Sequence, residues 1–457
     1  MGETERSLAQ WIVETAVDDT ASSVIERCRG ACFDQVGVTL VGAVQPVGRQ
    51  VHSLVRKMGG NPDASVIGGG FKTSAIQAAL ANGTAGHALD YDDLGIHSVG
   101  GRWWGYPTVV LLPTLLALGE PRGLSGRQIL EAYIIGFEVA CSLRRACTYD
   151  QTIRGFHSTA VFGTMGAAAA ASRLLHLSVE ETVTTLGIAA SMVSGVLQNL
   201  GTMTKPVHAG RSAEGAVLAA FLAHHGFTSS EDFLEGNVGW AHSFLGAGAF
   251  SCQAFLQGLG DLLSIPDRLV YKKYPCCGGS HTILDALLGL LRDSDVHYDE
   301  VSSVEIDDIA PTSAMGCYAP RTGLEAKFSV RWTVAVALRD EKVVVEQFTD
   351  DAVCDSRYLE AMEKVTRLEM QESHSKPVIV TIRAKDGHMY SRSLPMEGLV
   401  GTSKTPWAEA SLKNKFRENA SHLLSAPQVE EALEVWWGLE ELPDVRMALE
   451  LVRVERK

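Results

Sequence analysis

Residues 157–175 read HSTAVFGTMGAAAAASRLL, and the centre of this stretch, Gly166–Ala171, carries almost no side-chain bulk. The stretch has a helical pattern in which nearly every position is small or apolar, and such a helix is stable only when protein surrounds it. Small side chains also let neighbouring helix axes approach closely. The stretch therefore predicts a buried helix in a dense multi-helix bundle.

Helical periodicity extends over most of the first 262 residues, where apolar residues recur at three- and four-residue steps. Ser178 with two following acids is a start signal, as are Thr73 and Ser74, and Gly226 is a stop signal. The predicted helices are 22–41, 73–89, 126–144, 157–175, 178–197 and 211–225.

The pattern changes near residue 266. Strand-like alternation predicts strands at 301–306, 377–383 and 389–394, and helical periodicity predicts helices at 328–338, 357–367, 407–416 and 427–439. The predicted fold class is mainly α. It consists of a large all-helical domain, residues 1–265 and 401–457, and a smaller α+β lid domain, residues 266–400.

The composition is that of a soluble globular protein, with 457 residues, 46% hydrophobic and 21% charged. A net charge of −14 without a long basic run argues against nucleic acid or a membrane as partner. The first ten residues lack the order of a signal peptide, and the nine cysteines are scattered, so we expect reduced thiols and a cytoplasmic location.

Motifs for common cofactors are missing from the sequence. It has no dinucleotide-binding GxGxxG after a strand, no phosphate-binding P-loop, no HExxH and no GxSxG. Cys276 and Cys277 have no second pair at zinc-ligand spacing. We therefore expect neither a cofactor nor a metal.

The first of four polar clusters is ANGTAGHALDYDD, residues 81–93. Asp90 and Asp93 stand three residues apart and would share a helix face, so both carboxylates could meet the imidazole of His87. The alternative is that these acids only cap a helix end.

A glycine-rich loop with His97, Trp103 and Trp104 follows, and consecutive tryptophans in such a loop suit a pocket wall or an interface. The second cluster lies at the start of the alanine-rich helix, where Ser158 or the next threonine would cap the helix and the free N–H groups would face an anion. His157 stands at that opening, as a site residue or simply as a neighbour of the cap.

The third cluster contains Lys205, His208 and Arg211. Lys205 precedes a proline and is therefore expected outside a helix, and the three cations would form a carboxylate clamp. The alternative is a solvated basic turn. In the fourth cluster, YKKYPCCGGSH at 271–281, lysines and thiols lead into a helix that carries His281, although an interdomain linker would look similar.

These segments resemble, in the same order, the MmgE/PrpD family of 2-methylcitrate dehydratases, cis-aconitate decarboxylases and iminodisuccinate epimerases. The matching stretches are NGTAGHALDYDD, GFHSTAVFGTMGAAAAASRLL, TKPVHAGRSAEGAVLAAFLAHHGFTSSEDFLEG, KKYPCCGGSHTILDALL, PRTGLEAKFSVRWTVAVAL and GTSKTPWAEASLKNKF. The resemblance implies a helical domain built from both chain ends, a smaller lid domain, a homodimer, and an active site between the domains without metal or organic cofactor.

By position, the resemblance places Asp90, His157, Lys205 and Tyr318 in the catalytic site, with His208 in the same motif as the lysine. The family commonly has Thr and His where this chain has Leu94 and Tyr106, and the decarboxylases have His at Cys277. His97 or His281 could replace a missing imidazole. We also count Asp93, Trp103, Ser158 and Arg211 among the candidate substrate-binding residues.

Removal of a proton beside a carboxylate builds up negative charge, which the cationic cluster and the helix start at Ser158 could stabilise while Asp90 or His157 moves the proton. The preferred hypothesis is a dehydratase of the 2-methylcitrate dehydratase type, acting on a small polycarboxylic acid without a cofactor. An epimerase or a decarboxylase on the same scaffold is the alternative, and a non-catalytic small-acid-binding protein is the alternative from another class.

Overall fold

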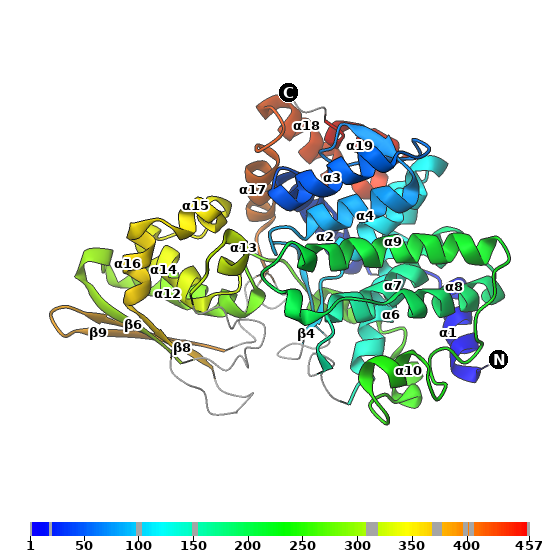
Figure 1. Ribbon diagram of the computed structural model, residues 1–457, viewed down its shortest axis with the longest axis horizontal. Helices are drawn as coiled ribbons and strands as arrows, with labels where there is room; N and C mark the ends of the chain where they lie inside the picture. Colours follow the sequence, from blue (N-terminus) through cyan, green and yellow to red (C-terminus); the bar gives the residue numbers. More distant parts are fainter. Residues whose placement is uncertain are drawn as a thin grey trace.

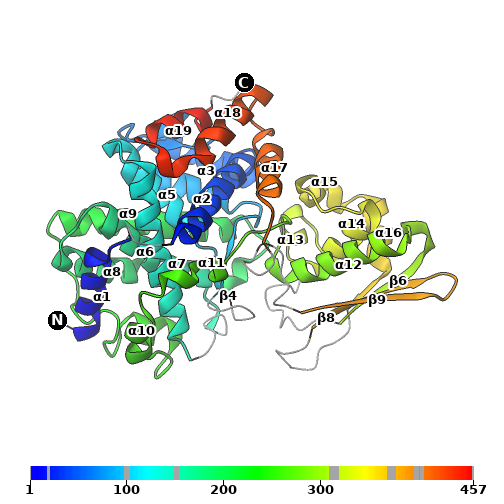
Figure 2. The same ribbon diagram turned by 180° about the vertical axis from the view of Figure 1, so that it is seen from behind.

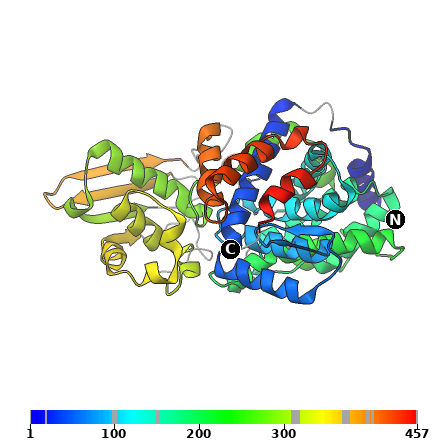
Figure 3. The ribbon, with the colours of Figure 1, turned by 90° about the horizontal axis from the view of Figure 1, so that it is seen from above.

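The computed structural model describes residues 2–17, 21–96, 103–148, 154–307, 319–367, 377–395, 401 and 406–454, with backbone only at Trp103 and Arg367. The chain forms a large helical body and a smaller α+β lobe beside it (Figure 1). Each has its own cluster of buried apolar side chains. Seen from above, in Figure 3, the two lie side by side with the N-terminus on the far side of the body.

The helices of the body come from both ends of the chain. They are α1 (Glu3–Glu14), α2 (Ser22–Ala43), α3 (Pro46–Met58), α4 (Ala75–Gly86), α5 (Thr108–Gly119), α6 (Gly126–Arg145), α7 (Ser158–Leu174), α8 (Val179–Met192), α9 (Thr204–His224), α10 (Cys252–Gly258), α11 (Ile265–Arg268), α17 (Glu409–Ala420), α18 (Ala426–Trp437) and α19 (Arg446–Val452). The tail helices pack on the body, and α17 lies at the boundary with the smaller lobe (Figure 2).

Small residues bring these helices into close contact, as the sequence predicted. On α4, a Cβ at Gly83 would lie 2.8 Å from the Cα of Gly210 on α9, and on α6 a Cβ at Gly136 would lie 2.6 Å from the carbonyl oxygen of Gly166 on α7. A methyl group cannot fit at these distances, so the backbones of the paired helices touch directly. The alanine-rich α7 is almost completely buried between its neighbours.

The body also contains short strands that the sequence did not predict. They are β1 (Ala64–Val66), β2 (Phe71–Thr73), β3 (Leu94–Ile96), β4 (Trp103–Gly105) and β5 (Leu269–Val270). The last three form an antiparallel sheet in the order β4-β3-β5. This sheet matters for the site, because β3 follows the DYDD motif, β4 leads into Tyr106 and β5 leads into Lys272.

The smaller lobe packs helices against one four-stranded sheet, in the order β7-β6-β8-β9, with β6 and β7 parallel and the other neighbours antiparallel. Its elements are α12 (His281–Ser294), β6 (Val301–Asp307), α13 (Gly323–Ala326), α14 (Val330–Asp340), α15 (Asp350–Val353), α16 (Ser356–Glu363), β7 (Val365–Arg367), β8 (Val378–Ala384) and β9 (Met389–Leu394). The helix predicted at 357–367 was wrong at its end, because the chain leaves the helix after Glu363 and pairs with β6.

Several helix starts and stops lie where the sequence predicts them. Ser74 caps α4, Ser178 forms a capping box with Glu181, and Gly226 ends α9 with a left-handed φ of 83°. The eight cysteines of the described part of the chain are free thiols. Among the described residues, no helix combines the length and the apolar character needed to span a bilayer.

Candidate active site

The DYDD motif lies in a turn rather than on a helix. Helix α4 ends at Gly86, His87 is its C-cap, and Asp90 adopts a left-handed φ of 53°. That conformation is uncommon outside glycine and persists only where surrounding contacts hold it. The prediction that Asp90 and Asp93 share a helix face was therefore wrong.

Asp90 is the centre of a buried group of charges. Its Oδ1 lies 2.5 Å from Nζ of Lys205 and its Oδ2 lies 3.2 Å from Nζ of Lys272. Burial alone would raise the pKa of Asp90, but the attraction of Lys205 and Lys272 outweighs it and places the pKa well below the usual range. Burial, only partly offset by Asp90, lowers the pKa of Lys205.

Lys205 occupies the first turn of α9, so its expected non-helical placement was wrong. The following proline is tolerated there because the first N–H groups of a helix have no intrahelical partner. The close contact of α4 with α9 at Gly83 and Gly210 aligns the end of one helix with the start of the other. That packing brings Asp90 and Lys205 together across 115 residues of sequence.

Three lysines hold the main chain of this turn from three directions. Lys272 donates to the carbonyl oxygen of Asp90, Lys327 donates to that of Ala88 at 2.8 Å, and Lys415 donates to that of Tyr91 at 3.0 Å. Lys415 comes from the tail helix α17 and also pairs with Asp34 at 2.8 Å. The turn is therefore fixed by side chains from the segment after β5, from the smaller lobe and from the C-terminal tail.

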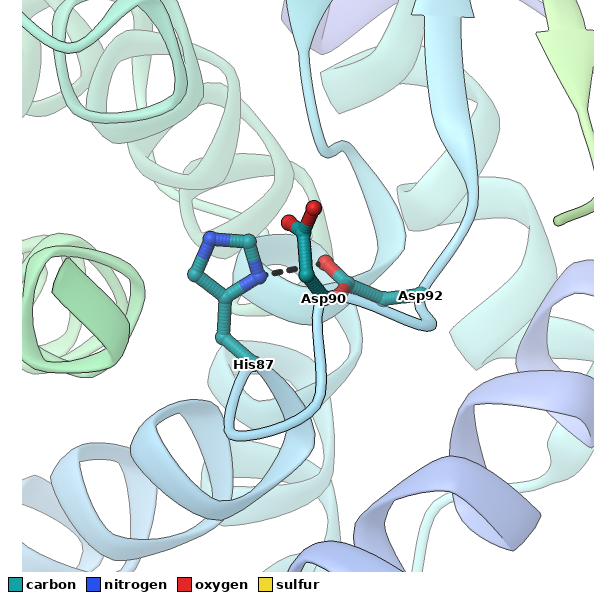
Figure 4. Close-up of side chains that lie close together, drawn as sticks. All are labelled: His87, Asp90 and Asp92. Carbon is teal, nitrogen blue, oxygen red and sulfur yellow. Dashed lines mark hydrogen bonds and ion pairs between the residues drawn. The ribbon is translucent and has the colours of Figure 1, made fainter. Parts of the chain in front are cut away.

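His87 and Asp92 form a buried pair beside Asp90, as Figure 4 shows. Nδ1 of His87 lies 2.7 Å from Oδ2 of Asp92, while Nε2 is buried and has no hydrogen-bond partner among the described residues. Burial lowers the pKa of His87 despite the charge of Asp92, so the ring is neutral at neutral pH. A neutral ring that donates through Nδ1 presents a free lone pair at Nε2, which suits a general base.

A second pair of imidazoles lies next to the first. Nδ1 of His157 is 3.2 Å from Nδ1 of His208, and Nε2 of His157 is 3.2 Å from the hydroxyl of Thr159. The rings of His87 and His157 are stacked, with centroids 5.9 Å apart. Burial lowers the pKa of His208 to about 4 and that of His157 well below its usual range. These rings can pass a proton on but do not hold a charge at neutral pH.

Tyr106 completes the group, and its ring lies under two ammonium groups. Nζ of Lys205 is 4.4 Å and Nζ of Lys272 is 4.6 Å from the ring centroid. Burial and the charge of Asp90 raise its pKa well above the usual value, so the phenol stays protonated. Gly105, with a φ of 141°, lets the chain pass against Thr159 just before Tyr106.

Several predicted site residues do not join this centre. Both carboxylate oxygens of Asp93 accept hydrogen bonds from Thr108, one from the backbone N–H at 3.2 Å and one from the hydroxyl at 2.5 Å. A buried carboxylate needs such donors because water cannot reach it. Arg211 is half exposed and pairs with Glu214, because six residues at 3.6 per turn place it on a different face of α9 from Lys205, so the predicted clamp does not form. Trp104 packs in the body core against Phe137, and it is not a pocket wall.

The predicted cap of α7 was also wrong, because His157 is the N-cap residue and Ser158 is the partly exposed first residue of the helix. Cys277 lies close enough to Asp90 and Lys272 for their charges to act on its pKa, which burial raises. His281 is buried against Tyr274, and burial lowers its pKa to about 3. His97, Tyr318 and the side chain of Trp103 lie outside the described residues.

Three residues of the centre were not predicted from the sequence, although His87 was. They are Asp92, Lys272 and Lys327. Each belongs to a stretch that carried a motif, and each is a buried polar or charged residue in a segment otherwise rich in glycine or apolar side chains. That combination was the available signal, but it did not show which residue of each stretch faces the centre.

Among the described residues, His87, Asp90 and Asp92 form the one cluster with possible metal-ligand geometry. A cation would have to compete there with the two ammonium groups that already contact Asp90. A metal ion bound to Asp90 would lie close to the ammonium groups of Lys205 and Lys272, and like charges repel strongly at short range in a buried site. The donor set therefore does not fit a metal ion.

A buried centre of imidazoles, carboxylates and lysines with strongly shifted pKa values, at the junction of two lobes, is typical of enzymes that work by acid–base chemistry. Comparison with known proteins agrees with this class. The MmgE/PrpD N-terminal domain matches residues 6–253 and the MmgE/PrpD C-terminal domain matches residues 274–440. The chain belongs to the MmgE/PrpD family, as its motifs indicated.

Three relatives illustrate the similarity. Cis-aconitate decarboxylase of Mus musculus is 27% identical over 472 residues, covering 98% of this chain and 93% of the mouse protein. The Homo sapiens protein of the same name is 27% identical over 468 residues, covering 98% and 94%. That of Aspergillus terreus is 25% identical over 473 residues, covering 97% and 95%. These relatives are carboxy-lyases, and the preference for a dehydratase stays a prediction.

Proposed function

We propose that this chain is a cofactor-independent lyase that moves a proton beside a carboxylate of a small polycarboxylic acid. The observation that carries the proposal is the charge of the centre. Lys205 and Lys272 contact one ionised carboxylate, Asp90, and a third buried lysine, Lys327, lies close enough for the charges of all three to act on its pKa. Buried lysines that share one carboxylate partner are stabilised when an anionic ligand binds beside them.

The same arrangement supports the chemistry. A base such as Nε2 of His87 takes a proton from the carbon next to a carboxylate, and the electron pair moves into that carboxylate. Lys205 and Lys272 stabilise the charge where it develops. In dehydration, the electron pair returns to form a C=C bond while hydroxide leaves with a proton from an acid such as Tyr106.

Decarboxylation is the second candidate, because the relatives named above are decarboxylases. Loss of CO₂ leaves an electron pair that is delocalised towards a remaining carboxylate, and a protonated group then delivers a proton to carbon. Tyr106, whose phenol stays protonated, is the proposed donor of that proton. Return of the proton to the opposite face, without loss of a group, would instead be epimerisation.

The test follows the substrate by NMR in deuterated buffer, with 2-methylcitrate, cis-aconitate and iminodisuccinate offered separately. An alkene signal from 2-methylcitrate supports the dehydratase, and release of CO₂ with loss of one carboxylate from cis-aconitate supports the decarboxylase. Deuterium exchange with inversion and no net product supports an epimerase. Binding of these acids without exchange or product would overturn the proposal in favour of a binding protein.

A further inference from the structure

Lys327 reaches from the smaller lobe into the body. It lies between α13 and α14, flanked by Ala326 and Val330 of the smaller lobe's core, and its carbonyl oxygen accepts from the backbone N of Cys277 at 3.0 Å. Its side chain is only 4% exposed, and Nζ donates to the carbonyl oxygen of Ala88 at 2.8 Å. The lysine therefore bridges the two lobes at the turn that carries Asp90.

Charged groups face Lys327 from each neighbouring element. They are Asp90 from the turn after α4, Lys205 from α9, Lys272 from the segment after β5 and Asp350 from α15. The next residue, Phe328, places its ring 5.5 Å from Nζ of Lys205. Two carboxylates, Asp90 and Asp350, thus act on a group of three lysines, and among the described residues neither carboxylate forms an ion pair with Lys327.

We propose that Lys327 is a substrate-carboxylate ligand that the smaller lobe contributes to the site. This inference rests on the proposed function and deepens it, because it assigns separate cations to separate carboxylates. A polycarboxylic acid would place one carboxylate near Lys205 and Lys272 and another against Lys327. The bound acid would then contact both lobes at once.

A change of protonation follows from this arrangement. In the free protein, burial first and the nearby lysines next lower the pKa of Lys327 to about 7. A carboxylate beside Nζ favours the ammonium form and raises that pKa again. Near pH 8, where the free side chain is mostly neutral, binding of the acid should draw close to one proton from the buffer.

A purely structural role is the rival explanation, since Lys415 holds the neighbouring carbonyl of Tyr91 in a similar way. In that case Lys327 would fix the turn at Ala88 and keep its protonation state when the acid binds. Proton uptake that depends on residue 327 separates the two explanations, because loss of a structural contact weakens binding but does not remove a bound proton.

The experiment is calorimetric titration with tricarballylate, a saturated tricarboxylate that cannot react by dehydration or loss of CO₂. Titration near pH 8 in phosphate and in Tris, whose ionisation enthalpies differ, gives the number of protons taken up. The wild type should take up close to one proton. Lys327→Arg, which stays charged, should bind without that uptake.

Lys327→Met should bind about tenfold more weakly or worse and should also lose the uptake. The matched control is Lys273→Met, because Lys273 is partly exposed, pairs with Asp285 and should change neither quantity. Equal uptake in the wild type and in either Lys327 variant would overturn the inference.

Two outcomes separate this inference from the function on which it rests. If Lys205→Met loses binding while Lys327→Met binds like the wild type, the proposed function stands and the inference fails. If neither tricarballylate nor cis-aconitate binds to the wild type, both fail. Circular dichroism of each variant shows whether it is folded before its titration is interpreted.

Discussion

Replacement of Lys205 by methionine is the sharpest test of the centre, because it should affect activity and stability through different contacts. Lys205→Met keeps the apolar stem and removes the ammonium group that lies 2.5 Å from Oδ1 of Asp90. It thereby removes a proposed substrate ligand and leaves a buried carboxylate with Lys272 as its remaining ion-pair partner among the described residues.

The structure sets the expected size of both effects. Loss of a hydrogen bond to a charged group costs about 1.5–3 kcal/mol, so kcat/KM should fall about 10- to 150-fold. Breaking a buried ion pair by removing one partner costs about 3–5 kcal/mol. In the variant, Lys272 still lies 3.2 Å from Asp90, so the free energy of unfolding should fall by about 3 kcal/mol, the lower end of this range.

The assay combines steady-state kinetics with urea unfolding for Lys205→Met, Asp90→Asn and the double variant. The double variant removes both charges of this ion pair but leaves Lys272 without its carboxylate, so it should recover only part of the stability that Asp90→Asn loses, while staying inactive. Arg211→Ala is the matched control on the same helix, because Arg211 is half exposed and pairs only with Glu214 among the described residues. Full activity of Lys205→Met, or equal stability losses in all three variants, would refute the reasoning.

Four further predictions concern the remaining groups. Tyr106→Phe should lower kcat by about 100-fold, and the wild-type pH–rate profile should show no limb from Tyr106 near neutral pH, because its pKa is raised; an unchanged kcat would count against an acid role. Asp92→Asn should lower kcat with little change in KM, because it removes the group that orients His87; a change in KM alone would point to substrate binding. The pKa of Lys327 is about 7 in the folded protein and 10.5 as its ordinary value, so between pH 7 and pH 10.5 the unfolded chain binds more protons than the folded protein. The free energy of unfolding should therefore rise with pH in that range, by up to about 1.4 kcal/mol per pH unit, and Lys327→Met should flatten the rise. Activity should survive exhaustive chelation, and a loss of activity that only added Zn²⁺ restores would contradict a centre that works without a metal ion.

Local sequence determined the secondary structure of the body to a large extent. The positions of α6 and α7 follow from periodicity within each segment, whereas the helix predicted at 178–197 was too long, because α8 ends at Met192. The helix boundaries at Ser178 and Gly226 follow from side-chain and backbone preferences of a few neighbouring residues. The close packing around α7 was equally predictable, because small side chains act through their own volume. The motifs also marked the right stretches for the site.

Which residue of each stretch enters the site was decided by tertiary structure alone. The pairing of Asp90 with Lys205 joins residues 115 apart, and the contact of Lys327 with Ala88 joins residues 239 apart. The left-handed turn at Asp90 is held by these distant lysines, and without it a helical reading of the motif is the reasonable one. Six residues of the same helix separate Lys205, which faces Asp90, from Arg211, which faces solvent, and the packing of α9 on α4 decides which of the two enters the site. The local sequence therefore determines which chemical groups each segment offers. Contacts between distant segments determine which of these groups come together in the site, and no local pattern contains those contacts.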